Sequence, residues 1–275
     1  MNPPYALKNR SLLSLDDLSA RDLVLLLTLA HALKRERREG REQQQLRGLH
    51  IATLAAAGAA NADDPLETAA AEQGALVVHL GPQPPPQPGD ADRHELPGLL
   101  GRLYDAVEVR GMPRAALREF ASRCSVPVYR DLGDAAHPAR VIADLMSMQE
   151  QTGKPLERSA VAWLGDAHSE RGEALMHGAL LMGIDLHIAA VGARRPDGDR
   201  LAHLRGLALA HGARLSLHES AAEALLGCDF GFDDRQAMPL RPTPSDPPLL
   251  HSGRDTALDG NRVHAVKALL VATLA

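Results

Sequence analysis

The stretch that decides the fold runs from Gly101 to Gln151 and opens with GRLYDAVEVRG, residues 101–111. Val107–Val109 is short and mostly apolar with a charge at its end, and Val126–Tyr129 is a second run of the same kind. Both are predicted to be buried strands, with a helix between them. The segment HPARVIADLMSMQE, residues 137–150, then predicts a long helix. Its proline suits the first helical position, where an N–H would be unpaired anyway, and its apolar residues recur at helical spacing.

Strands and helices alternate on both sides of this stretch. Before it we expect a helix from the N-cap Ser19 to about Arg38, a strand at 50–55, a helix at 66–73 and a strand at 75–80. After it we expect strands at 160–164, 185–190, 214–217 and 228–232, and helices from about 174 to 183, 200–212, 221–226 and 261–275. The proline-rich segments 81–90 and 239–248 are predicted to be irregular. The alternation predicts an α/β fold with mainly parallel sheets.

Composition narrows the function classes. The chain has 275 residues, enough for one or two domains, and a net charge of −5, which does not suggest a nucleic-acid partner or an anionic membrane. Cys124 and Cys228 lie far apart, and free thiols are favoured over a disulfide. We see no leader or membrane span, and expect a cytoplasmic protein.

Two kinds of bound group are not supported by the sequence. Gly165 follows a strand, but the segment lacks the glycine fingerprint of a dinucleotide site. The 13 histidines show no metal-ligand spacing. We therefore expect no metal and no cofactor.

Three motifs in the central stretch resemble the aspartate/ornithine carbamoyltransferase family, and within it the ornithine branch. The family's Arg-Met-Tyr-Asp, Tyr-Arg-Gly and His-Pro-Thr-Gln-x-x-Ala-Asp correspond to Arg102-Leu103-Tyr104-Asp105, Val109-Arg110-Gly111, and His137-Pro138-Ala139-Arg140 with Ala143-Asp144. Order and spacing agree, and a thinner similarity extends over nearly the whole chain.

The resemblance implies two Rossmann-like parallel-sheet α/β domains joined by bridging helices. We expect residues 1–136 to correspond to the carbamoyl phosphate domain and 137–258 to the amino-acid (ornithine) domain. Residues 259–275 are expected to form a C-terminal helix that packs back on the first domain. The resemblance also implies a homotrimer, or a hetero-oligomer with an active paralogue, and a small-molecule amino-acid ligand.

The family's anion-binding motif is replaced in this chain. In the family, Ser-Thr-Arg-Thr-Arg at a helix N-terminus holds carbamoyl phosphate, because free N–H groups, the helix dipole and arginines favour an anion. The corresponding positions here are Ala59-Ala60-Asn61-Ala62-Asp63, and Asp64 adds further negative charge. Charge-assisted hydrogen bonds contribute about 1.5–3 kcal/mol each, so losing several weakens phosphate binding by on the order of 10³-fold or more.

Other family motifs are also altered. Pro86 and Asp90 stand where a neighbouring subunit would contribute Gln and Lys, and Arg140 replaces the glutamine of His-Pro-Thr-Gln. The loop 165–170 lacks both asparagines of Gly-Asp-x-x-Asn-Asn, and the segment 234–240 keeps only Asp234 of Asp-x-Trp-x-Ser-Met-Gly. The His-Cys-Leu-Pro motif corresponds only thinly to 250–254.

The resemblance leaves five candidate site residues. Arg110, His137 and Asp234 are candidate catalytic residues, and with Arg140 and Arg262 they are candidate substrate-binding residues. Arg140 is included because a guanidinium can clamp a carboxylate. Structural roles are favoured for the other four: Arg110 pairs a carboxylate, His137 and Asp234 cap the segments that follow them, and Arg262 ties the last helix to the first domain.

Three functions remain open at this point. The leading hypothesis is a non-catalytic homologue that serves as a binding, scaffolding or regulatory protein. The first alternative is an active enzyme that makes citrulline and phosphate from carbamoyl phosphate and L-ornithine. The second is a repurposed enzyme of the same fold that acts on a different ligand.

Overall fold

The computed structural model describes the chain except for residues 1–6, 57–63, 84–90, 190–191 and 234–255. The chain divides into two units, residues 1–139 with 262–275, and residues 140–261. Each unit contains one parallel sheet covered by helices, which is the fold class predicted from the sequence. The predicted boundaries followed residues 136 and 258; the observed ones fall inside two helices, α5 (Pro138–Thr152) and α9 (Thr256–Leu274).

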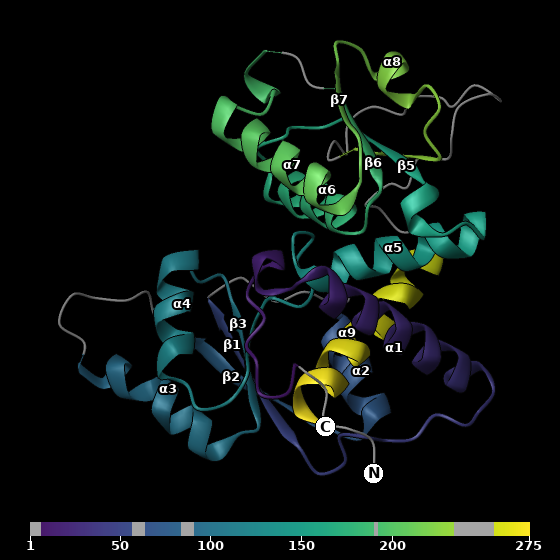
Figure 1. Ribbon diagram of the computed structural model, residues 1–275. Helices are drawn as coiled ribbons and strands as arrows, with labels where there is room; N and C mark the ends of the chain where they lie inside the picture. Colours follow the sequence, from purple (N-terminus) through teal and green to yellow (C-terminus); the bar gives the residue numbers. More distant parts are fainter. Residues whose placement is uncertain (1–6, 57–63, 84–90, 190–191, 234–255) are drawn as a thin grey trace. The chain divides into compact units, whose positions relative to one another are not determined.

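The first unit is built on a four-stranded parallel sheet in the order β2-β1-β3-β4. Its strands are β1 (His50–Ala56), β2 (Leu76–Gln83), β3 (Ala106–Arg110) and β4 (Val128–Arg130). Its helices, besides α9, are α1 (Ala20–Arg38), α2 (Pro65–Gln73), α3 (Ala91–Leu103), α4 (Arg114–Arg123) and the 3-10 turn η1 (Leu15–Asp17). Figure 1 shows α3 and α4 on one face of this sheet and α1, α2 and α9 on the other.

Helix ends in the first unit follow from local chemistry. Ser19 and Asp22 form the predicted capping box at the start of α1. Gly74 ends α2 with φ of +83°, a conformation that a residue without a Cβ adopts without strain. The core beneath α3 and α4 contains Leu100, Leu117 and Phe120, packed on the buried strand β3.

Helix α9 contributes a buried stripe to the first unit. Its residues 265–266 and 268–272 are completely buried, and Lys267 is buried among them. The Lys267 Nζ atom lies 2.7 Å from Glu42 Oε1 and also pairs with Glu72 of α2. The Tyr129 hydroxyl lies 2.6 Å from Thr273 Oγ1. These contacts join the last described helix to segments more than one hundred residues earlier in the chain.

The second unit has a four-stranded parallel sheet in the order β7-β6-β5-β8. Its strands are β5 (Ala160–Trp163), β6 (Asp185–Ala189), β7 (Leu215–His218) and β8 (Phe230–Phe232). Its helices are α6 (Glu170–Leu181), α7 (Gly198–His211) and α8 (Ala221–Leu225), with 3-10 turns η2 (Leu156–Arg158) and η3 (Gly192–Arg194). Trp163 packs against α6 at Gly172, whereas Ala162 packs with Ala224 and Leu225 of α8, so α6 and α8 cover opposite faces.

Two expectations about elements are corrected. Helix α3 was not predicted, because Pro97 lies inside it and its polar start hides the helical pattern. Strand β2 runs on to Gln83, into the segment predicted to be irregular; β2 is an edge strand, where a proline removes no hydrogen bond that the sheet needs. The second segment that was predicted to be irregular, residues 239–248, lies outside the described residues. No helix in the described part of the chain is long and apolar enough to cross a membrane.

Candidate functional site

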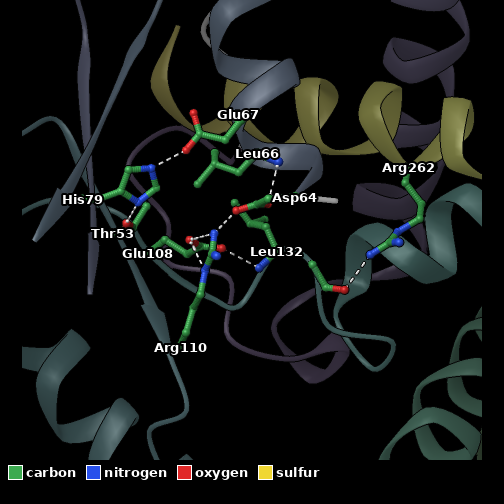
Figure 2. Close-up of polar contacts among 10 residues, drawn as sticks. Thr53, Asp64, Leu66, Glu67, His79, Glu108, Arg110, Leu132 and Arg262 are labelled. Atoms are coloured by element: carbon green, nitrogen blue, oxygen red, sulfur yellow. Dashed lines mark hydrogen bonds and ion pairs between the residues drawn. The ribbon is translucent and has the colours of Figure 1, made fainter. Parts of the chain in front are cut away.

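Arg110 ends strand β3, and its side chain is bound by two carboxylates (Figure 2). The Arg110 Nε atom donates to Glu108 Oε2 at 2.8 Å, and a terminal nitrogen of the guanidinium lies 2.7 Å from the same oxygen. Another hydrogen bond joins the guanidinium to Asp64 Oδ2. The side chains are 5% exposed for Arg110, 0% for Glu108 and 6% for Asp64. The sequence predicted a carboxylate partner for Arg110, but not that Glu108 and Asp64 would both bind it.

Asp64 is also the N-cap of helix α2, directly after the positions that correspond to the family's Ser-Thr-Arg-Thr-Arg motif. Its Oδ1 atom accepts a hydrogen bond from the Leu66 N–H at 2.9 Å, and Pro65 occupies the first turn of α2. One carboxylate therefore satisfies the helix N-terminus and the Arg110 guanidinium at once. An Asp-Pro pair before an apolar position is a helix-start signal, so the cap was readable from the sequence. The contact with Arg110, 46 positions away, was not.

The surroundings of Arg110 are acidic. Asp131, which follows β4, adds a third carboxyl group that is partly buried; burial raises its pKa, Asp134 raises it further, and Arg110 lowers it. Burial raises the pKa of Glu108 to about 7, despite the attraction of Arg110. Burial alone would lower the pKa of Arg110, but Glu108 and Asp64 outweigh it and raise that pKa. One cation thus faces three carboxyl groups, and the cluster favours a bound cation over a bound anion.

A second polar chain lies beside this cluster on the same sheet. Thr53 of β1 is in register with His79 of β2 and with Glu108 of β3. Thr53 Oγ1 lies 2.8 Å from His79 Nδ1, and His79 Nε2 lies 2.5 Å from Glu67 Oε1 (Figure 2). Hydroxyl, imidazole and carboxylate in this order suggest a nucleophilic triad. Thr53 is only 2% exposed, however, so its hydroxyl is not accessible as a nucleophile. The three side chains instead tie the first turn of α2 to the sheet.

His137 is buried at the start of α5. It is 2% exposed, and its Nδ1 accepts a hydrogen bond from the Ala139 N–H at 3.1 Å. This is the capping role that the sequence suggested for the residue before Pro138. Burial lowers the pKa of His137 to about 3, so the ring is neutral at pH 7 and can accept the N–H.

Arg140 is also buried and is bound within its own unit. Its Nε atom donates to Asp144 Oδ1 at 3.2 Å, one helical turn further along α5. Arg171 of α6 lies 2.6 Å from the other oxygen of the same carboxylate. Arg140 is 5% exposed and Asp144 is 0% exposed. The sequence suggested a guanidinium that clamps a ligand carboxylate; the carboxylate that it binds here is that of Asp144.

The two remaining candidates are placed differently. Arg262 donates to the Gly133 carbonyl at 2.6 Å and so ties α9 to the loop after β4, which matches its structural interpretation (Figure 2). Asp234 lies outside the described residues. No group of three or more potential metal ligands occurs among the residues that the structure describes. Cys124 and Cys228 are both free thiols.

Comparison with known proteins assigns the chain to a family. Residues 10–150 match the model of the aspartate/ornithine carbamoyltransferase carbamoyl-P binding domain. The catabolic ornithine carbamoyltransferase of Pseudomonas putida is 36% identical over 230 residues, which cover 84% of this chain and 68% of that protein. The catabolic ornithine carbamoyltransferase of Burkholderia mallei is 37% identical with the same coverage. The chain therefore belongs to the aspartate/ornithine carbamoyltransferase family, as its motifs suggested.

Solved structures give the same fold. The ornithine carbamoyltransferase of Pyrococcus furiosus matches with a TM-score of 0.85 and 21% identity, over 98% of both chains. The ornithine carbamoyltransferase of Gloeobacter violaceus matches with a TM-score of 0.79 and 24% identity, over 99% of this chain and 100% of that one. These similarities establish the carbamoyltransferase fold for this chain.

Proposed function

We propose that this chain is a non-catalytic member of its family that acts as a binding, scaffolding or regulatory subunit. The observation that carries the proposal is the state of Arg110. Its guanidinium is buried and bound by Glu108 and Asp64, both contributed by the same unit. Arg110 is a candidate substrate-binding residue by the family resemblance, and here its guanidinium already has anionic partners.

Electrostatics and the sequence support the same conclusion. A phosphate group would have to displace Asp64 from Arg110, and breaking a buried ion pair costs about 3–5 kcal/mol, which corresponds to roughly 10²- to 10⁴-fold in affinity. In their ionised forms the remaining carboxyl groups, Glu108 and Asp131, would repel a phosphate dianion. The arginines that could offset this are absent from Ala59-Ala60-Asn61-Ala62-Asp63.

The test is calorimetric titration of the pure protein with carbamoyl phosphate, together with an assay for citrulline in the presence of L-ornithine. An ornithine carbamoyltransferase purified in the same way serves as the positive control. We expect no heat of binding and no citrulline from this chain. Citrulline formation that disappears in Arg110→Ala would show that the chain is an active carbamoyltransferase.

The assembly is a separate part of the proposal. The relatives described above are carbamoyltransferases, and the family resemblance implies trimers, so we propose that this chain forms a homotrimer or assembles with an active paralogue. Native mass spectrometry of the chain, alone and after co-expression with such a paralogue, tests this. If both samples contain nothing but monomers of this chain, the proposed assembly is contradicted.

A further inference from the structure

Two histidine rings lie face to face at the edge of the second sheet. His187 of β6 and His218 of β7 have ring centroids 5.0 Å apart and an angle of 21° between their planes. In the parallel register His187 is opposite Ser216, so Ser216, His218 and His187 lie on one face of the sheet. The Ser216 hydroxyl lies 3.0 Å from His218 Nε2 and fixes that ring. Strand β7 is the edge strand, so it has a sheet neighbour on one side only.

Helix α8 covers this face of the sheet. Ala162, which is opposite His187 in β5, packs in one cluster with Ala224, Leu225 and Cys228. The His187 Nδ1 atom is buried, and among the described residues it has no hydrogen-bond partner. A second proton on the ring would therefore place a charged N–H donor in a buried position without an acceptor, which is costly.

The charged groups around His187 do not offset the cost of placing a positive charge on its ring. On β6 the nearest is Asp185, whose carboxylate accepts from the Arg214 N–H and from Arg214 Nε, both at 2.8 Å. Arg214, just before β7, is itself a cation. Cys228 donates its thiol to the Ala224 carbonyl, and Glu223 lies in the first turn of α8.

We propose that the stacked rings of His187 and His218 are a proton-sensitive clasp that holds strand β7 and helix α8 against β6 near neutral pH and releases them in mild acid. The neutral rings pack against each other with their centroids 5.0 Å apart, and protonation of His187 puts a charge without an acceptor under a covering helix. The proposal concerns the second unit only and does not depend on the proposed loss of catalysis.

The direction of the effect follows from linkage. Burial lowers the pKa of His187, and the neighbouring His218 lowers it further, against the Ala224 carbonyl and Asp185. A group whose folded-state pKa is lowered binds protons more readily once its surroundings open. The clasp is therefore fully stable above the ordinary histidine pKa of about 6.5 and weakens as the pH falls below it.

The experiment is amide hydrogen exchange of the full chain at pH 7.5 and pH 5.5, with rates corrected for the intrinsic pH dependence. We expect the protection of residues 215–225 to fall by roughly tenfold at pH 5.5, because the open state gains a proton about one unit below its pKa. Strand β5, in the same sheet, serves as the internal reference and should keep its protection. Equal protection of residues 215–225 at the two pH values would overturn the proposal.

Two variants identify the responsible pair. His187→Phe keeps a flat ring against His218 but cannot be protonated, so the loss of protection at pH 5.5 should disappear. His177→Phe is the matched control, because His177 of α6 forms the other ring pair of this unit, edge to face with His203 at 5.7 Å. The His177→Phe protein should still show the full loss of amide protection in residues 215–225 at pH 5.5. A His187→Phe protein that still loses protection would contradict the clasp.

A measurement on the unmodified protein covers the case in which His187→Phe does not fold. The proton NMR shifts of the histidine rings can be followed from pH 8 to pH 5. We expect the His187 ring to titrate below the ordinary histidine range, together with the exchange of residues 215–225. Titration of His187 in the ordinary range, with unchanged exchange, would refute the proposal.

Discussion

At the scale of single residues, the neighbours of Arg110 give its side chain a structural role, because its guanidinium binds carboxylates of the same unit. Two buried carboxylates, Glu108 and Asp64, bind its guanidinium, and the partly buried Asp131 lies near it, so among the described residues Arg110 joins the end of β3 to the start of α2. The residue type is the one that the family uses for anions, and the difference lies in the side chains around it.

Replacing Arg110 by methionine should therefore destabilise the first unit strongly. Removal of one partner from a buried ion pair costs about 3–5 kcal/mol, because the other charge is left uncompensated. The control is Arg123→Met, which removes an exposed pair with Glu119 and should cost about 0.5 kcal/mol or less. Urea unfolding at pH 8 measures both. A cost for Arg110→Met no larger than that of the control would show that the cluster is not what holds α2 in place.

His137 predicts a pH dependence of stability. Its pKa is lowered to about 3 in the folded protein, so the folded state resists a proton that the unfolded state accepts. Stability is fully present above the ordinary pKa of about 6.5 and falls by about 1.4 kcal/mol for each pH unit below it.

His137→Asn should remove this part of the pH dependence and keep the cap, because an asparagine oxygen can accept the Ala139 N–H. The measurement is the difference in unfolding free energy between pH 7.5 and pH 5.5, compared for the two proteins. We expect the variant to lose about 1.4 kcal/mol less than the wild type over this interval. Identical pH dependence would show that the ring is not buried as a neutral group.

At the scale of single elements, apolar periodicity and helix-start signals predicted most of the structure. The capping box at Ser19, the strand around Val107 and the closing helix were all readable, because each depends on residues close in sequence. The contact between Asp64 and Arg110 was not readable, because it joins a helix cap to a strand end 46 positions later. Local sequence patterns carry no information on pairs of residues that are far apart in the chain. The sequence therefore named candidate residues such as Arg110, but not the side chains that they contact.

The contact between α6 and β5 gives a test of packing at this scale. A Cβ at Gly172 would come within 2.7 Å of the Trp163 ring and 2.8 Å of the Asp166 carbonyl oxygen. Gly172→Ala should therefore cost about 1–3 kcal/mol through overpacking, although alanine favours a helix.

The matched control is Gly206→Ala in α7, where a Cβ would meet nothing within 4 Å. This change should stabilise the protein by about 0.4–1 kcal/mol, since alanine restricts the unfolded chain and suits a helix. Thermal unfolding of both variants decides the point. If the two substitutions shift the midpoint in the same direction, the close packing of α6 on Trp163 is refuted.

At the scale of the whole molecule, the first unit depends on two distant parts of the chain. Helix α9 brings Lys267 between Glu42 and Glu72, and its apolar residues 268–272 are completely buried. Residues 1–139 alone would expose this apolar surface and leave the two glutamates without their lysine.

We therefore expect a fragment of residues 1–139 to be unfolded or aggregated. The same fragment joined through a flexible glycine-serine linker to residues 262–275 should fold. Circular dichroism and the dispersion of amide NMR signals distinguish the two. A control fusion with Lys267→Met should be less stable by about 3–5 kcal/mol, because it removes the lysine that pairs with the buried carboxylate of Glu42, whereas Glu72 keeps its ion pair with Arg37. A folded 1–139 fragment without α9 would contradict this account.

The placement of α9 also has a consequence for synthesis on the ribosome. Residues 140–261 form a continuous insertion, so that unit has all its residues while the first unit is still incomplete. The first unit, although it is made earlier, lacks its buried helix until residues 262–275 have left the exit tunnel. The first unit of the nascent chain therefore exposes the apolar surface that α9 later covers, for most of the time of translation. Chaperones that recognise such surfaces should act on the first unit rather than on the second.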